Sequence, residues 1–252
     1  MHLDVRQLRN FYYRSHLGRA VQRSARTQLD ILWPHADGET VVGFGFAVPL
    51  LRQFLPEARR VTALMPGPQG VMHWPHAKNN ISVLCDEGLW PLETGSVDKL
   101  LLFHGLDASE NPAAVLEECY RVLNPSGRVI FIVPNRTSLW SRREGTPFSL
   151  SRPYTPGQIE AQVKWHGFKP VNHVTALYQP PWTKRFWLKT GSLWDRVGHS
   201  IPAWRGGGIL MVEVIKQVPR PKRPGLGQII SRPLGVLDGM TSPDGKLANS
   251  SR

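Results

Sequence analysis

Cysteine and long apolar runs are both scarce in this 252-residue chain. Its two cysteines, Cys85 and Cys119, have no metal-ligand spacing, so we expect reduced core thiols rather than a metal site or a disulfide framework. No apolar run approaches the length of about 18 residues that a membrane-spanning helix needs. No signal-peptide core is visible near the start. We therefore expect a cytoplasmic protein without a metal.

Acidic residues are also few, because 19 Asp and Glu face 31 Lys and Arg, which leaves a net charge of +12. Residues 1–35 contain six arginines and two aspartates, and residues 219–252 contain six basic residues and two aspartates. Such an excess suits an anionic partner, either RNA or a membrane surface. The basic tail is interpreted as an interaction arm for nucleic acid or a partner protein, or alternatively as a solubilising segment.

What the chain does contain is a distinctive stretch at residues 40–51. A β-branched run ends in a glycine pair and leads into an apolar segment with leucines, which predicts a strand, a tight turn and a helix. Gly43 and Gly45 carry no Cβ, so the backbone can turn sharply and a ligand can approach. The start of the next helix would offer free N–H groups. The stretch is a candidate nucleotide or nucleoside cradle, or alternatively a purely structural turn.

Strand-like and helix-like segments alternate through the rest of the chain. Strands are predicted at residues 60–65, 81–85, 97–103, 128–133, 169–178 and 209–218, and helices at about 47–55, 111–123 and 155–165. This alternation predicts an α/β fold with a doubly wound, mostly parallel sheet. Ligands of such sheets bind beyond the carboxyl ends of the strands. That rule predicts one crevice built from residues 43–47, 65–66, 86–87, 103–105 and 134–135.

Three regions are predicted along the chain. Residues 1–35 form a helical extension with a helix at 5–33, interpreted as a basic lid or as a covering helix with a solvated basic face. Residues 36–218 form the α/β domain, and the proline-rich residues 219–252 are predicted to be disordered. Residues 182–198 also have a helical pattern, with tryptophans that would belong to the core, shield a planar or lipidic acceptor, or stack on nucleic-acid bases.

Three stretches resemble the class I S-adenosylmethionine-dependent methyltransferases, specifically their small-molecule type 11 branch. Residues 90–102, WPLETGSVDKLLL, are similar to the family segment L-P-F-x-x-x-S-F-D-x-V. Residues 111–128 are similar to its L-x-E-x-x-R-V-L-K-P-G-G helix and turn, and residues 152–168 to its R-x-Y-T-P-E-x-L…G-F stretch. The resemblance covers about residues 35–218 and implies a Rossmann-like sheet of seven strands whose last strand is antiparallel.

The resemblance implies S-adenosylmethionine as the cofactor. Carried over position by position, it implies cofactor contacts at Gly43, Phe44, Gly45, Ala47, Met65, Asp86, Glu87 and Phe103. Two acids of the family pattern are replaced, one by Val41 in the first motif and the ribose-binding one by Met65. A carboxylate–hydroxyl bond contributes roughly 1.5–3 kcal/mol, so each loss would weaken binding about tenfold to hundredfold.

His104 follows the fourth predicted strand, where acceptors approach in this family. It is the candidate general base for an acceptor that must lose a proton, or alternatively a structural loop histidine. The sequence thus predicts a methyltransferase that acts on a small-molecule or lipid-like acceptor. The first alternative is a cofactor-deficient scaffold or partner-binding module, which Val41 and Met65 favour, and the second is an RNA or protein methyltransferase, which the charge favours.

Overall fold

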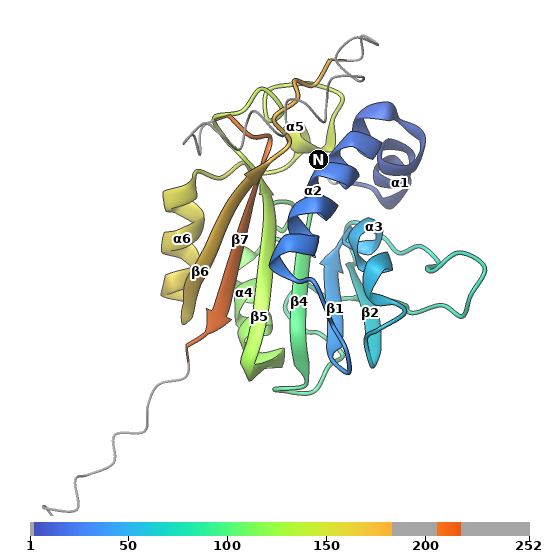
Figure 1. The fold of residues 1–252 in the computed structure, drawn as a ribbon, viewed down its shortest axis with the longest axis vertical. Helices are drawn as coiled ribbons and strands as arrows, with labels where there is room; N and C mark the ends of the chain where they lie inside the picture. Colours follow the sequence, from blue (N-terminus) through green and yellow to red (C-terminus); the bar gives the residue numbers. More distant parts are fainter. Residues whose placement is uncertain (1–2, 183–205, 218–252) are drawn as a thin grey trace, which may run out of the picture. The chain divides into compact units, whose positions relative to one another are not determined.

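The computed structural model describes residues 3–182 and 206–217, and a seven-stranded sheet in the order β3-β2-β1-β4-β5-β7-β6 runs through them (Figure 1). The strands are β1 Thr40–Gly45, β2 Arg60–Pro66, β3 Ser82–Cys85, β4 Val97–Phe103, β5 Leu123–Pro134, β6 Phe168–Ala176 and β7 Ile209–Lys216. Strands β1 to β6 run parallel, and β7 lies antiparallel between β5 and β6. The predicted fold class, including the antiparallel last strand, is confirmed.

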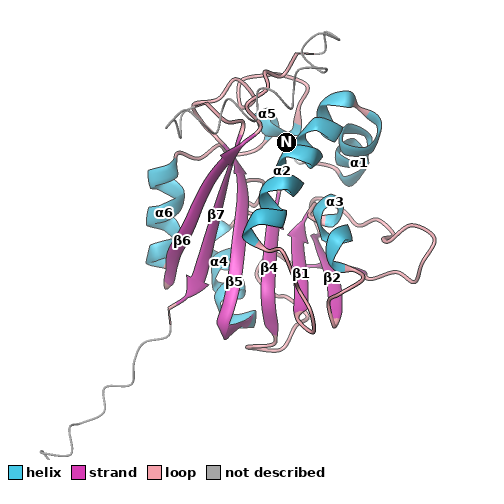
Figure 2. Cartoon of the chain, viewed as in Figure 1, coloured by secondary structure: helices cyan, strands magenta, loops and turns pink. Residues whose placement is uncertain are grey.

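Helices cover both faces of this sheet (Figure 2). One hydrophobic core joins the sheet to α1 Val5–Arg14, α2 His16–Leu32 and α3 Val48–Leu51, and a second joins it to α4 Pro112–Val122 and α6 Pro156–Trp165. The central strands serve both cores because neighbouring side chains point to opposite faces: Val41 belongs to the first and Val42 to the second. Two short segments, the 3-10 helix η1 Arg52–Phe54 and α5 Pro147–Leu150, complete the helical elements of the described residues.

The N-terminal helical segment differs from the prediction, because residues 5–33 form two helices rather than one. Ser15 is extended, with φ −89° and ψ 151°, and its side chain accepts from the Gly18 N–H at the start of α2. A Cβ on Gly18 would lie 2.0 Å from the carbonyl oxygen of Phe11, so this crossing of the two helices requires glycine. The break directs α1 toward the carboxyl ends of β1 and β4, where its Tyr12 meets Phe46 and Phe103.

The helices predicted to begin near residues 111 and 155 are present, and each has an N-terminal cap. Asn111 caps α4 before Pro112, and Thr155 and Gln158 form a capping box at the start of α6. Residues 69–77 form a loop between β2 and β3. Most of the segment 182–198 and the whole of 219–252 lie outside the described residues. No helix within 3–182 or 206–217 has the length and hydropathy needed to cross a bilayer.

Candidate functional site

The glycine turn after β1 packs directly on the loop after β4. Gly45 has φ +80°, and a Cβ there would lie 2.5 Å from the Phe103 carbonyl oxygen and 2.7 Å from the Gly105 nitrogen. The Phe46 N–H donates to the same Phe103 carbonyl over 2.7 Å. Gly43 is constrained as well, since a Cβ would meet Leu51 of α3 at 2.6 Å. Packing of the protein therefore requires glycine at both positions, and the backbone of residues 103–105 occupies the space where a side chain at Gly45 would lie.

Tyr12 of α1 fills the crevice above this turn. Its ring stacks on Phe46, with centroids 5.6 Å apart and planes at 24°, and lies 5.3 Å from the Phe103 ring. All three rings are almost completely buried. The Tyr12 hydroxyl lies 2.6 Å from Nε2 of His104. The first helix is therefore fastened over the carboxyl ends of β1 and β4 by an aromatic stack and a buried hydrogen bond.

His104 is held from both sides. Its Nδ1 lies 3.0 Å from the Asp107 carboxylate, which can only accept, so Nδ1 carries the proton and Nε2 accepts from Tyr12. Burial, and then the negative charge of Asp107, raise the pKa of Tyr12 well above its ordinary value, so this phenol stays protonated. The His104 side chain is 1% exposed. In this arrangement both ring nitrogens are hydrogen-bonded to side chains of the protein, so neither is available to a substrate that would accept a methyl group.

The segment before Tyr12 closes the crevice further. The Val5 N–H donates to the Gln69 carbonyl over 2.8 Å, and the Gln69 side chain donates to the His104 carbonyl over 3.2 Å. Leu3 is buried in the same place. The cavity that is left between Leu3, Gln69, Glu87 and His104 measures about 10 Å³, which is roughly the space of one water molecule.

An open pocket lies beside this closed part, at the carboxyl end of β3 and the start of α4. It has a volume of about 590 Å³, within the usual size range of small-molecule sites. Asp86, Glu87 and Glu110 contribute carboxylates to its lining, to which no lysine or arginine of residues 3–182 or 206–217 contributes. We call this the acidic pocket. Burial, with smaller contributions from Asp86, Glu118 and Glu87, raises the pKa of Cys85 in its wall to about 12, so this thiol is not a nucleophile near neutral pH.

The two acids after β3 are held differently. Glu87 accepts from the Ser109 hydroxyl at 2.5 Å and from the Glu110 N–H at 3.2 Å, which ties it to the start of α4. Asp86 is exposed and accepts from the Gly88 N–H through one oxygen only. At the end of β2, by contrast, the buried Met65 sulfur accepts from the Met72 N–H, and no carboxylate stands there.

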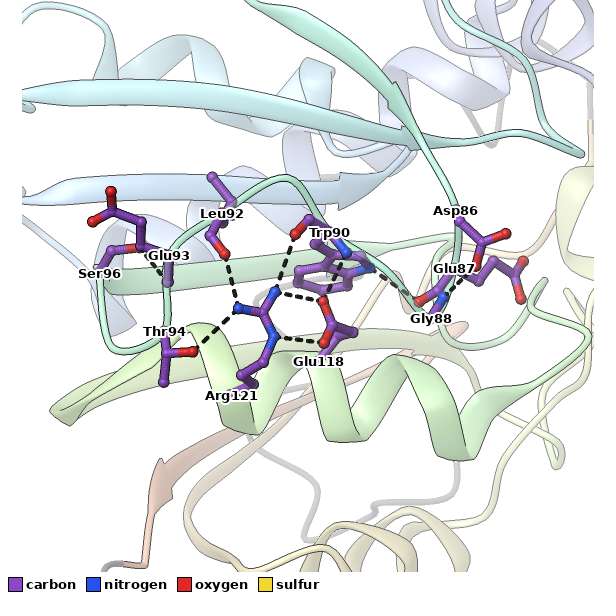
Figure 3. A network of polar contacts seen from close by, with 10 residues as sticks. All are labelled: Asp86, Glu87, Gly88, Trp90, Leu92, Glu93, Thr94, Ser96, Glu118 and Arg121. Atoms are coloured by element: carbon purple, nitrogen blue, oxygen red, sulfur yellow. Dashed lines mark hydrogen bonds and ion pairs between the residues drawn. The ribbon is translucent and has the colours of Figure 1, made fainter.

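A polar network positions the loop that carries these acids (Figure 3). Arg121 of α4 makes two bonds to the Glu118 carboxylate, at 2.6 and 2.7 Å, and also donates to the Leu92 and Trp90 carbonyls. Glu118 in turn accepts from the Trp90 N–H, and the Trp90 indole donates to the Glu87 carbonyl. The Arg121 hydrogen bond is the main reason that the pKa of Glu118 is lowered.

The predicted cofactor residues thus fall into separate groups. Gly45, Ala47, Met65, Phe103 and the candidate base His104 gather in the closed part of the crevice, and Asp86 and Glu87 line the acidic pocket. Gly43 packs against α3, while Phe44 faces the other core and stacks on Trp90 at 4.5 Å. No motif in the sequence marks Tyr12, Gln69, Asp107 or Glu110 as a site residue. The periodic apolar pattern identified Tyr12 as a buried helix position, but no pattern indicates where on the sheet a helix lies.

Residues 41–131 match the model of a methyltransferase domain family, type 11. The fold is similar to that of an S-adenosylmethionine-dependent methyltransferase, possible histamine N-methyltransferase, from Thermotoga maritima, with TM-score 0.55, 17% identity, and coverage of 80% of this chain and 91% of the other. No curated protein matches the chain.

Two further structures share the fold. One is in a complex between the Trm112 methyltransferase activator and a candidate methyltransferase from Haloferax volcanii, with TM-score 0.58, 17% identity, and coverage of 81% and 95%. The other is the [4+2]-cyclase SpnF, with TM-score 0.54, 16% identity, and coverage of 82% and 85%. The same fold therefore occurs with a reaction other than methyl transfer, so the fold by itself does not fix the chemistry.

The cofactor of this domain family is S-adenosylmethionine. The acidic pocket fits the adenosine end of that molecule, because it is open and offers carboxylates to amino and hydroxyl groups. The methionine end of the cofactor would lie above Gly45, and that space does not fit it in the described arrangement because Tyr12 fills it. Residues 41–131 thus match the model of a methyltransferase domain, within a chain whose fold is similar to that of S-adenosylmethionine-dependent methyltransferases.

Proposed function

We propose that this protein binds S-adenosylmethionine and methylates a small-molecule or lipid-like acceptor. The observation that carries the proposal is the acidic pocket, which shares Pro68 and Glu87 with the small cavity at His104 and lies in a segment that matches a methyltransferase domain. When bound, S-adenosylmethionine supplies an electrophilic methyl group. The adenosine end carries an adenine amino group and ribose hydroxyls, and the three carboxylates that line the pocket can accept hydrogen bonds from them.

In this proposal the chain's own carboxylates bind the adenosine end. The second oxygen of Asp86 is exposed to the pocket and can accept from an amino or hydroxyl group. Glu87 lines both the acidic pocket and the small cavity beside Gln69, and Ser109 holds it in place. Met65 has no oxygen that could bind the ribose hydroxyls, and Glu87 is the carboxylate that can bind them instead.

The rest of the crevice becomes available when α1 moves aside. Departure of Tyr12 leaves Nε2 of His104 with a free lone pair, while Asp107 keeps the ring in the same tautomer and orientation. A neutral histidine oriented by a carboxylate is the arrangement of a general base. His104 would then take the proton of an acceptor that must lose one.

A second candidate is a methyltransferase-fold protein that binds no cofactor and serves as a scaffold or partner-binding module. The observation that favours it is the closed crevice, with Tyr12 over the glycine turn and with Val41 and Met65 in place of two acids. The structural relatives include a chain from a complex with a methyltransferase activator, so binding of a partner protein is compatible with this fold.

Calorimetric titration with S-adenosylhomocysteine separates the two candidates. The enzyme proposal predicts binding that Asp86→Asn weakens about tenfold to hundredfold, because one charged hydrogen-bond acceptor is lost. Asparagine keeps the bond to the Gly88 N–H, so the loop should stay folded. Asp37→Asn is the matched control, since Asp37 is exposed and lies outside the pocket. Absence of heat at millimolar ligand would refute the enzyme proposal and favour the scaffold.

A further inference from the structure

A second large cavity, of about 900 Å³, lies between α1, η1 and the loop that follows β2. Figure 1 shows α1, α3 and this loop at the same side of the sheet. Arg9 and Arg14 of α1, Arg52 of η1 and Lys78 of the loop line it, and no aspartate or glutamate of the described part of the chain does. We call this the basic pocket. Its charge is opposite to that of the acidic pocket, so the two call for different ligands.

The four cations of the basic pocket are unpaired. None of them has a side-chain hydrogen bond or an ion pair with any residue in 3–182 or 206–217, whereas Arg121 and Arg128 each have a glutamate partner. Like charges that share a cavity repel one another unless a counter-ion joins them. The chain itself supplies no such counter-ion within these ranges, and an anionic ligand would relieve the repulsion.

The base of the basic pocket is aromatic and apolar. Trp74 is 5% exposed, and Met72 and Leu55 lie beside it in the lining. Tyr13 contributes a phenol that is 42% exposed. Burial raises the pKa of Tyr13, while the charges of Arg52, Arg26 and Arg9 act in the opposite direction, which is the effect of cations gathered around one hydroxyl. The pocket therefore combines an apolar floor with a cationic rim.

We propose that the basic pocket binds a phosphorylated small molecule with an aromatic or apolar body. Guanidinium groups form paired hydrogen bonds to phosphate oxygens, and Trp74 and Met72 would bury the body. The cations come from three separate segments that surround one concave space, which suits a compact ligand better than the extended backbone of a nucleic acid. The proposal is independent of methyl transfer and of the acidic pocket.

The test is calorimetry on the full-length protein with 1-naphthyl phosphate, 1-naphthol and inorganic phosphate. We expect 1-naphthyl phosphate to bind at least tenfold more tightly than either of the other two, because only this probe uses both the rim and the floor. Rising salt should weaken its binding. Failure of 1-naphthyl phosphate to bind at millimolar concentration overturns the proposal. Tighter binding of a 15-nucleotide oligouridylate would overturn it too, in favour of a nucleic-acid surface.

Paired double variants locate the site. Arg9→Gln with Arg52→Gln should weaken 1-naphthyl phosphate at least tenfold, since two charge-assisted contacts are lost. Arg23→Gln with Arg142→Gln removes the same charge from exposed positions outside the pocket and should change affinity less than twofold. Equal losses in both double variants would contradict the assignment. Binding of S-adenosylhomocysteine should be the same in both, so failure of this proposal is distinguishable from failure of the proposed function.

Discussion

Removal of the Tyr12 hydroxyl tests how α1 is held over the crevice. Tyr12→Phe keeps the ring that stacks on Phe46 but leaves Nε2 of His104 buried without its donor. An unsatisfied buried acceptor costs about 1–3 kcal/mol. The free energy of unfolding should fall by that amount, which corresponds to a melting temperature lower by about 2–12 °C for a domain of this size. Urea titration followed by tryptophan fluorescence measures it.

The neighbouring residue provides the control. Tyr13 is half-exposed, and its hydroxyl has no hydrogen-bond partner among the described residues. Tyr13→Phe should therefore change the free energy of unfolding by no more than about 0.5 kcal/mol. If Tyr12→Phe were as neutral as Tyr13→Phe, the buried bond to His104 would not hold the first helix, and the reasoning about the closed crevice would be wrong.

Two further variants probe the frame of the site. Glu118→Gln breaks the paired bonds to Arg121. The pKa of Glu118 is lowered in the folded state, so the ionised carboxylate stabilises the fold. This stabilisation is complete above pH 4.5, the ordinary pKa, and is lost as the pH falls below that value. The difference in unfolding free energy between wild type and Glu118→Gln, measured by urea titration, should therefore shrink on acidification, and a constant difference would contradict the ion pair. Gly45→Ala should destabilise by about 1–3 kcal/mol or more through strain and contact with the Phe103 carbonyl. Gly38→Ala, at φ +69° in open space, should cost less in the same thermal unfolding experiment, and an equal cost would refute the close contact at Gly45.

The sequence predicted the sheet well because its strands are short apolar runs bounded by strong turn signals. The central strand β4 is an almost unbroken apolar segment, which is the pattern of a strand buried on both faces. The resemblance also marked Glu118 and Arg121, although only the structure gives their role as supports of the loop that carries Glu87. Motif similarity located these residues, and their contacts explain them.

The closed crevice and the basic pocket could not be predicted in the same way. Tyr12 occupies an apolar position of an amphipathic helix, and such periodicity gives the buried face without the place on the sheet. Arg9, Arg52 and Lys78 are far apart in sequence and meet only because the α1–α2 break and the loop after β2 bring them together. Tertiary packing decides both features.

The two pockets have opposite charge, although the chain as a whole is basic. The net charge of +12 predicts an anionic partner, but the pocket at the carboxyl end of β3 is lined by carboxylates. The basic pocket gathers, at a different place, cations that have no ion-pair partner among the described residues. Overall charge therefore describes the surface as a whole and not the candidate cofactor site.

The most direct test of the central claim compares two ligands in wild type and in Tyr12→Ala. Methylthioadenosine has only the adenosine end, whereas S-adenosylhomocysteine also extends toward Gly45, where Tyr12 lies. Calorimetry should show that both bind wild type, and that Tyr12→Ala improves the affinity for S-adenosylhomocysteine relative to methylthioadenosine by about tenfold or more. The ratio cancels any general loss of stability. An unchanged ratio, or no binding of either ligand, would contradict the account.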